Sequence, residues 1–126
     1  MLTARISVVI IKDKKILLVT DGSGMYWTPG GKLEDGETHI EALDRELEEE
    51  LKIKSLSAKQ YISYEALHEI KKVMQKVFCY LVDISGDITP SAEITKYGWY
   101  SKDNLPRLMT SIKSNLIPKL IEDKLL

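Results

Sequence analysis

The segment 38–51 most constrains the fold, because it has the period of a helix in a chain whose other apolar runs have the period of strands. Its apolar residues recur three or four positions apart, at Ile40, Leu43, Leu47 and Leu51. This spacing gathers them on one face of an α-helix. Thr38, with Glu41 three residues later, forms a capping box. The sequence therefore predicts an amphipathic helix from about His39 to Leu51.

The remaining apolar runs read as strands. Residues 5–11 and 16–19 flank a polar turn and predict an N-terminal hairpin. Residues 55–67 and 73–84 predict two further strands, and residues 97–100 a short one. In 73–84, alternation places one set on one face (Val73, Gln75, Val77, Cys79, Leu81) and another on the opposite face (Met74, Lys76, Phe78, Tyr80, Val82).

The C-terminal segment 111–125 predicts a second helix, which Pro118 would kink or delay. Strands and helices are mixed without regular βαβ alternation. This order favours an α+β fold or a sandwich with a mixed sheet.

Composition narrows the class of protein. The 126 residues suit one domain over 1–126, and a net charge of -1 disfavours a basic protein that coats nucleic acid. Cys79 is the single cysteine, which excludes an internal disulfide framework and a cysteine-based zinc site. No apolar run has the length of a membrane span, and no signal peptide is evident. We therefore expect a cytoplasmic protein.

Acidic residues are concentrated in one window. Between Glu34 and Glu50 there are nine acids and one base, Arg45, so the window carries -8 and the rest of the chain +7. On the helix, Glu46, Glu49 and Glu50 form one stripe beside the apolar face, where like charges repel. A hard divalent cation would neutralise such a cluster, because Mg²⁺ prefers oxygen ligands and keeps sites for phosphate. A merely solvated helix face is the alternative.

The spacing of eight residues over 31–53 resembles the Nudix box, G-x5-E-x7-R-E-U-x-E-E-x-G-U with U apolar: Gly31, Glu37, Arg45, Glu46, Leu47, Glu49, Glu50 and Ile53. The one departure is Lys52, where the family has glycine; this substitution puts the helix's C-terminal cap in doubt. Similarity continues in residues 27–31 before the box and in Glu93, Trp99 and Tyr100 after it, over nearly the whole chain.

The resemblance implies an α/β/α sandwich around a mixed β-sheet and hydrolysis of a nucleoside diphosphate linked to another moiety, with Mg²⁺ or Mn²⁺. By position, it implies a metal-binding role for the Gly30 carbonyl, Glu46, Glu49 and Glu50. Glu37 and Arg45 would brace the preceding loop on the helix.

A carboxylate must take the proton of the attacking water. Glu49 is the first candidate and Glu93, expected in a loop before the last strand, is the second. For the substrate we expect Arg5 to contact phosphate, with simple solvation as the alternative. Aromatic side chains could stack on a base (Tyr26, Trp27, Tyr64, Phe78, Tyr80, Tyr97). Packing is the default for each, and Phe78 with Tyr80 is the preferred pair because they share a face.

Sequence motifs that are typical of subgroups of the resembled family allow some substrate classes to be set aside. The chain lacks the proline of an ADP-ribose type, an aligned tyrosine of a diadenosine polyphosphate type and the coenzyme A motif. We therefore expect a MutT-like nucleoside triphosphate pyrophosphohydrolase, which could clear damaged nucleotides. The alternatives are an ADP-ribose or dinucleoside polyphosphate hydrolase and a non-catalytic nucleotide-binding domain. We expect a small nucleotide as substrate and no nucleic-acid polymer or membrane as partner; the sequence does not indicate the oligomeric state.

Overall fold

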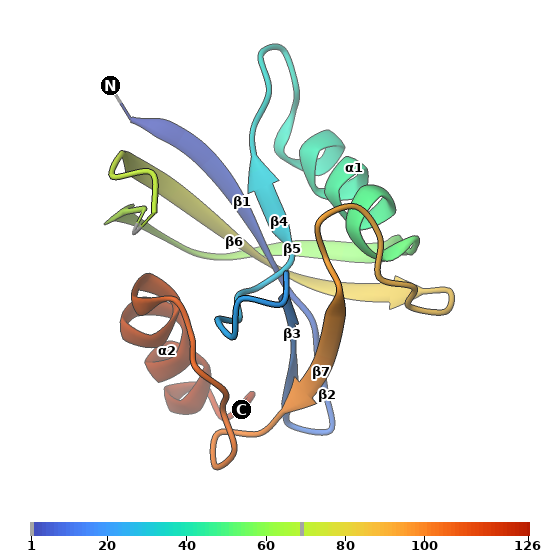
Figure 1. Ribbon diagram of the computed structural model, residues 1–126, viewed down its shortest axis with the longest axis vertical. Coiled ribbons are helices and arrows are strands. Elements are labelled where there is room, and N and C mark those ends of the chain that lie inside the picture. Colours follow the sequence, from blue (N-terminus) through green and yellow to red (C-terminus); the bar gives the residue numbers. More distant parts are fainter. Residues whose placement is uncertain (1, 69) are drawn as a thin grey trace.

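The computed structural model describes residues 2–68 and 70–126 (Figure 1). Its elements, in chain order, are β1 (Thr3–Val9), β2 (Ile11–Lys12), β3 (Lys15–Thr20), β4 (Gly30–Lys32), α1 (His39–Leu51), β5 (Lys54–Leu67), β6 (Met74–Ser85), β7 (Lys96–Tyr100), η1 (Ile112–Leu116) and α2 (Ile117–Glu122).

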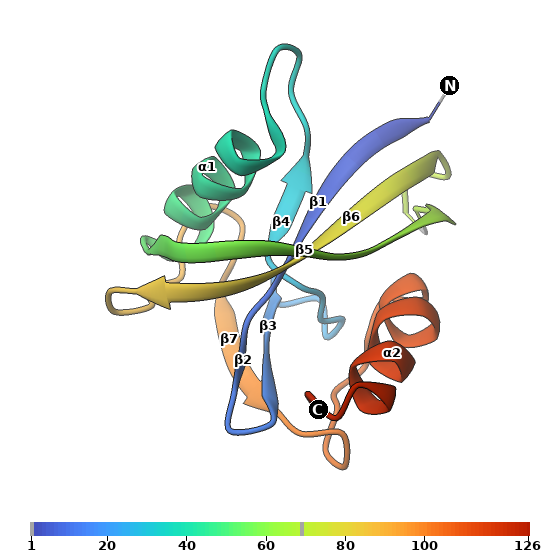
Figure 2. The same ribbon diagram turned by 180° about the vertical axis from the view of Figure 1, so that it is seen from behind.

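The strands form two sheets. One has the order β4-β1-β6-β5 and is mixed, because β1 runs parallel to β6 and antiparallel to β4. The other has the order β2-β3-β7 and is antiparallel. Figure 2 shows β5 and β6 as long strands that cross the rest of the molecule, and they pair along most of their length.

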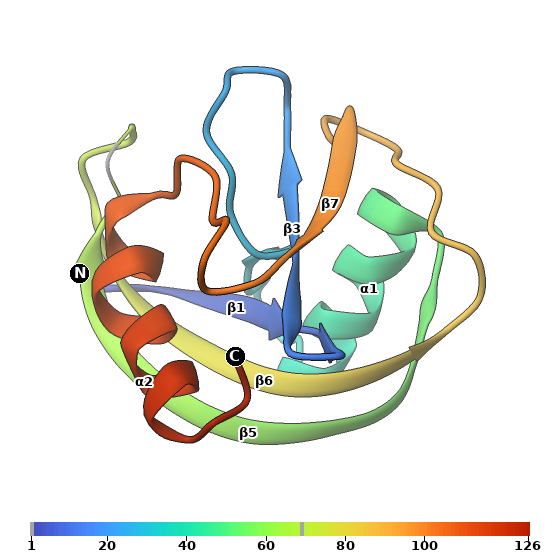
Figure 3. The same ribbon diagram turned by 90° about the horizontal axis from the view of Figure 1, so that it is seen from below.

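The two helices lie on opposite sides of the strands (Figure 3). One buried cluster joins α1 to Ile6 and Val8 of β1, and a second joins the C-terminal helix to Val9 of β1. The predicted faces of β6 separate accordingly: Tyr80 and Val82 pack in the first cluster, Val77 and Cys79 in the second. The predicted α/β/α arrangement with a mixed sheet is confirmed.

Helix α1 has the predicted bounds and cap. The Thr38 hydroxyl accepts from the Glu41 N–H, and the Glu41 side chain accepts from the Thr38 N–H. Ile40 is 42% exposed, however, so its predicted place in the buried stripe is wrong. Ile40 lies in the first turn of α1, and the buried apolar residues of the helix are Ala42, Leu43, Leu47 and Leu51.

Lys52 ends α1 in the left-handed conformation, with φ 57° and ψ 38°. This is the geometry that glycine adopts without strain and that any other residue adopts at a cost. The backbone N–H of Lys52 still donates to the Glu48 and Leu47 carbonyls, so the departure from the glycine pattern leaves the capping geometry intact.

The N-terminal hairpin differs from the prediction in its first arm. β3 pairs with the short β2, while β1 leaves for the other sheet. The tight turn lies at Asp13 and Lys14, both with positive φ, which matches the twist of a two-residue hairpin. β1 pairs with β4 on one side and β6 on the other, so it is an interior strand of the larger sheet, and its Ile6, Val8 and Val9 are all buried.

The C-terminal helix begins with a π-helical segment, η1, and continues as α2. Pro118 is the second residue of α2 and follows directly after η1, so it has no N–H to donate to the preceding helical turn. The wider turn is closed by the Ile117 N–H, which donates to the Ile112 carbonyl five residues earlier. In the described part of the chain, no helix has the length and apolar character needed to cross a bilayer.

Candidate functional site

Two glycines bring β4 close to both β1 and α1. Gly30 has φ 135°, and a Cβ built there would lie 2.0 Å from the Ile6 carbonyl oxygen. A Cβ at Gly31 would lie 2.3 Å from Glu46 Oε1. A side chain at Gly30 would clash with the backbone of β1, and one at Gly31 would have to displace the Glu46 carboxylate, so these two glycines let the edge of the sheet lie against the carboxylates of α1.

Glu46 and Glu50, one turn apart on α1, are buried at this edge. Burial raises the pKa of Glu50 to about 8, although its Oε1 accepts from the Gly30 N–H at 2.9 Å. Burial also raises the pKa of Glu46, against the attraction of Arg45. Two buried carboxylates close to each other repel when both are ionised, and this repulsion destabilises the folded protein. A cation bound near both would remove the repulsion, so the site favours cation binding.

Arg45 ties the loop before α1 to the helix. Its guanidinium donates to both oxygens of Glu37, at 2.6 and 3.0 Å, and to the Lys32 carbonyl at 3.1 Å. This two-point contact lowers the pKa of Glu37. Arg45 also donates to Glu46 Oε1 at 2.8 Å, so one side chain fixes the loop and orients a buried carboxylate.

Glu49 lies apart from the buried pair. Its side chain is 53% exposed, and its Oε2 is 3.5 Å from Arg45 Nη1. Among residues 2–68 and 70–126, no three acidic, histidine or cysteine side chains converge tightly enough to hold a metal ion by themselves. The donor set present is therefore two carboxylates, which is the number that Mg²⁺ commonly takes from a protein when phosphate oxygens and waters complete its shell. The residues present fit such an ion.

A cleft of about 540 Å³ opens over this edge of the sheet. Its wall contains Arg5, predicted for phosphate, three of the four predicted metal ligands (Gly30, Glu46, Glu50), the motif glycine Gly31 and the candidate proton acceptor Glu93; Glu49, the fourth predicted metal ligand, is not part of it. A smaller recess of about 30 Å³ adjoins it, and Arg5, Trp27 and Gln75 line both spaces. The carboxylates therefore line the cleft but not the recess, whereas the cationic Arg5 lines both spaces and links them.

Arg5 and Glu93 act on the buried pair from other elements. Arg5, on β1, favours the charged forms of Glu46 and Glu50. Glu93, in the loop between β6 and β7, adds a negative charge that opposes ionisation of Glu50. With Gly30 and Gly31 of β4, the structure thus brings together six of the predicted site residues from four segments of the chain.

Phe78 and Tyr80 lie elsewhere. They point toward α1, where His39 packs on the Phe78 ring at 4.4 Å and its Nδ1 is 2.9 Å from the Tyr80 hydroxyl. Neither residue lines the cleft or the recess. Because β6 alternates, the face that carries them is opposite the face of Gln75 and Val77, and this placement argues against the stacking role expected for them.

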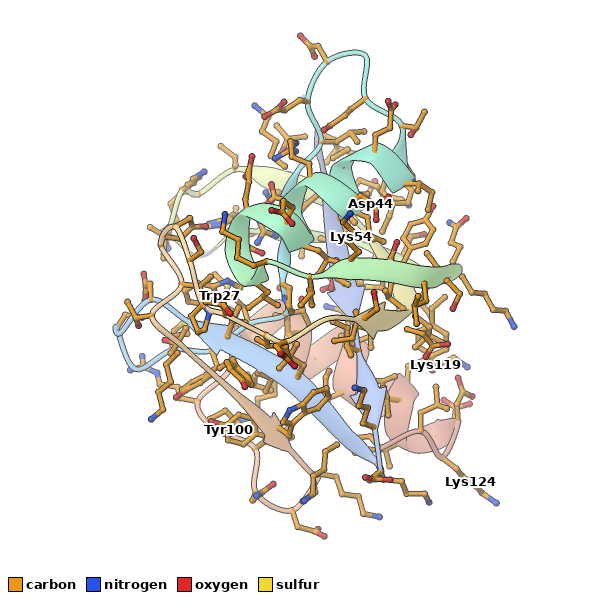
Figure 4. All side chains as sticks on the ribbon, turned by 90° about the vertical axis from the view of Figure 1, so that its right-hand side faces the viewer. Trp27, Asp44, Lys54, Tyr100, Lys119 and Lys124 are labelled. Atoms are coloured by element: carbon orange, nitrogen blue, oxygen red, sulfur yellow. The ribbon has the colours of Figure 1, made fainter. Side chains whose placement is uncertain are left out.

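Trp27, Tyr64 and Gln75 are the residues that sequence reasoning underrated. Trp27, labelled in Figure 4, lies beside β3, where its backbone pairs with Val19. Tyr64 and Gln75 come from β5 and β6, and all three line the recess. One signal existed: Gln75 is the single amide on an otherwise apolar strand face. No pattern in the sequence indicated which of the six candidate aromatic residues would line the recess.

The fold and the site define a domain of mixed-sheet α/β/α architecture with paired buried carboxylates in a cleft, and the comparisons give its family. A NUDIX domain model matches residues 1–120, so the chain belongs to the NUDIX domain family. No curated protein matches the sequence.

Solved structures agree. A MutT NUDIX hydrolase from Burkholderia pseudomallei is 25% identical with a TM-score of 0.79, over 90% of this chain and 94% of that one. A MutT structure from a study of Aliivibrio salmonicida and Vibrio cholerae is 20% identical with a TM-score of 0.75, over 98% and 99%. A UDP-X diphosphatase is 24% identical with a TM-score of 0.69, over 97% of this chain and 60% of that one. The family and the MutT neighbour support a pyrophosphohydrolase.

Proposed function

We propose that the chain is a cytoplasmic, Mg²⁺- or Mn²⁺-dependent nucleoside triphosphate pyrophosphohydrolase that releases a nucleoside monophosphate and pyrophosphate. The observation that carries the proposal is the pair of buried carboxylates, Glu46 and Glu50, in one cleft with Arg5. Acids that suit a cation and a base that suits phosphate are the two requirements for binding a metal-bridged polyphosphate.

Glu46 and Glu50 would hold the metal, with the Gly30 carbonyl beside them. A divalent ion there would neutralise phosphate oxygens and acidify a water. Arg45 keeps Glu46 oriented, and the Gly30 N–H keeps Glu50 oriented. Glu49, half-exposed and beside Arg45, fits a supporting electrostatic role better than a central ligand position.

Glu93 is our proposed proton acceptor, in preference to Glu49. Glu93 lines the cleft that holds the buried pair, whereas Glu49 does not. A general base must come within hydrogen-bond reach of the attacking water, directly or through one other water. Glu93 stands on a loop opposite α1, where it would face a water bound between the carboxylates and the phosphate.

The nucleobase would lie in the cleft where it meets the recess, rather than against Phe78 and Tyr80. Trp27 and Tyr64 offer aromatic faces there, and Val77 and Met109 add apolar walls. Base stacking on an aromatic residue is sequence-tolerant and contributes roughly 1–3 kcal/mol. Metal-bound phosphates would lie at the carboxylates and Arg5, and the base would lie beyond Arg5, which is the order of these groups along a nucleotide.

The test is a product assay with Mg²⁺ over nucleoside triphosphates, ADP-ribose, a nucleotide sugar and a dinucleoside polyphosphate, with pyrophosphate, phosphate and monophosphate resolved. We expect pyrophosphate and monophosphate from at least one triphosphate. A preference for ADP-ribose, the nucleotide sugar or the dinucleoside polyphosphate would assign the chain to that substrate class. Absence of turnover with every compound would indicate a binding domain.

Variants on one helix make this assay specific to the site. Glu46→Gln and Glu50→Gln keep the size of the side chains and remove a negative charge. Glu48→Gln is the matched control, because Glu48 is exposed on the same helix and lies outside the cleft lining. Activity that persists unchanged in Glu50→Gln would contradict the proposal.

A further inference from the structure

Two neighbouring side chains beside the recess have polar groups without a protein partner. Thr3 Oγ1 is a buried oxygen with no hydrogen bond. Gln75 is only 8% exposed, and among the described residues its side-chain amide makes no hydrogen bond. Buried polar groups are almost always paired, and an unpaired one is costly unless a ligand or water completes it.

These two residues are adjacent in space. β1 and β6 run parallel, and Thr3 is the register partner of Gln75. Register partners of neighbouring strands present their side chains on the same face of the sheet. Thr3 and Gln75 both line the cleft, and Gln75 also lines the recess. A hydroxyl and an amide therefore meet at the junction of the two spaces.

Two other polar groups of the recess already bond each other. The Ser7 and Thr28 hydroxyls bond each other at 2.7 Å. The Ser111 side chain lies near the Tyr64 hydroxyl. The remaining walls include Val77, which is apolar. Thr3 and Gln75 add a hydroxyl and an amide that can bind a ligand where the two spaces meet.

We propose that Thr3 and Gln75 recognise the hydrogen-bonding edge of the nucleobase and so determine which bases the enzyme prefers. This inference rests on the proposed function, because it takes the phosphates to lie at Glu46 and Glu50. The base then lies in the cleft beside the recess, with a ring face against Trp27, which lines both spaces. An amide supplies one acceptor and two donors, and a hydroxyl supplies both, so together they match the alternating donors and acceptors of a base edge.

Binding without turnover tests the inference. Nucleoside 5′-monophosphates carrying the four common bases, and ribose 5-phosphate as the baseless probe, are titrated with Mg²⁺ while tryptophan fluorescence is followed. Trp27 lies at the cleft, and the other tryptophan, Trp99, lies on β7 near Lys12, outside the lining of both spaces. For the wild type we expect affinities that differ between bases and exceed that for ribose 5-phosphate.

Gln75→Leu should lower the affinity for the preferred base roughly tenfold, the loss of about one buried hydrogen bond, and narrow its advantage over ribose 5-phosphate. Thr3→Val should do the same to a smaller extent. Gln75→Glu replaces the donors by acceptors, so we expect a changed order of bases. Gln60→Leu, at an exposed glutamine on β5, is the matched control and should retain the wild-type order.

An unchanged order of bases in Gln75→Leu and Gln75→Glu would overturn the inference. A uniform loss that includes ribose 5-phosphate would also overturn it, since a structural role would act in that way. Triphosphate hydrolysis by the same samples separates the two proposals. If Gln75→Leu hydrolyses triphosphates with an unaltered base preference, the proposed function stands and the inference about Thr3 and Gln75 fails. If the wild type binds bases selectively but hydrolyses no triphosphate, the inference stands and the proposed function fails.

Discussion

The substitution Glu50→Gln should stabilise the metal-free protein near neutral pH. Burial raises the pKa of Glu50 from an ordinary 4.5 to about 8. The folded state therefore binds a proton that the unfolded state releases between these pH values. The free energy of unfolding falls as pH rises through this window, and the full loss is reached above pH 8.

The magnitude follows from the width of the window. At pH 7 the raised pKa of Glu50 destabilises the folded state by up to about 3.5 kcal/mol, at about 1.4 kcal/mol for each pH unit above 4.5. A glutamine carries no such cost, and its oxygen can still accept from the Gly30 N–H. We expect Glu50→Gln to be about 2–3 kcal/mol more stable at pH 7 and nearly equal to the wild type at pH 5.

Urea unfolding in a chelating buffer at pH 5, 6, 7 and 8 measures this difference, because both tryptophans report unfolding by fluorescence. Glu48→Gln should show no pH-dependent difference from the wild type, since Glu48 is exposed on the same helix. A Glu50→Gln protein that is less stable than the wild type, or whose advantage does not grow between pH 5 and 8, would refute the reasoning.

Three further outcomes are expected. Lys52→Gly should raise the free energy of unfolding by about 1 kcal/mol, because φ is 57° there, measured by the same urea titration. Gly31→Ala should abolish most turnover while the protein still folds, since the new Cβ would displace the Glu46 carboxylate; kcat and circular dichroism test this. Glu93→Gln should lower kcat by roughly 10²-fold, the contribution of a general base, and Glu49→Gln should lower it less.

Each of these has a control in the chain. Lys54→Gly, at a strand residue, should destabilise rather than stabilise. Gly36→Ala has open space around its Cβ, so turnover should persist despite its positive φ. If Glu49→Gln impairs kcat more than Glu93→Gln, the assignment of the proton acceptor reverts to the helix.

Local signals predicted α1 well, because cap, period and length are all encoded within a few neighbouring residues. Thr38 and Glu41 form the predicted box, and alternation in β6 separated Tyr80 from Cys79 correctly. β1 was misassigned to a hairpin with β3. Its apolar run satisfies either sheet, and the choice depends on long-range pairing with β6, which no local pattern contains.

The candidate site also has a part that the sequence predicted and a part that depends on long-range packing. Fixed spacing on one helix brought out Glu46 and Glu50, and the structure places both at the cleft. Helical geometry grouped Glu49 with them, but only the position of β4 decides which side of the acidic stripe is buried. Which aromatics border the recess likewise depends on how β5, β6 and the 105–112 segment meet, so Trp27 and Tyr64 could not be separated from Phe78 by sequence.

The central claim is that Glu46, Glu50 and a nucleoside triphosphate share a divalent cation in the cleft. Calorimetric titration of Mg²⁺ into the protein with a non-hydrolysable nucleoside triphosphate measures this most directly, with Glu50→Gln and Glu48→Gln run in parallel. The account predicts saturable Mg²⁺ binding in the wild type and in Glu48→Gln, weakened at least tenfold in Glu50→Gln, on the order of one lost charge-assisted contact. Equal Mg²⁺ affinity in all three proteins would contradict it.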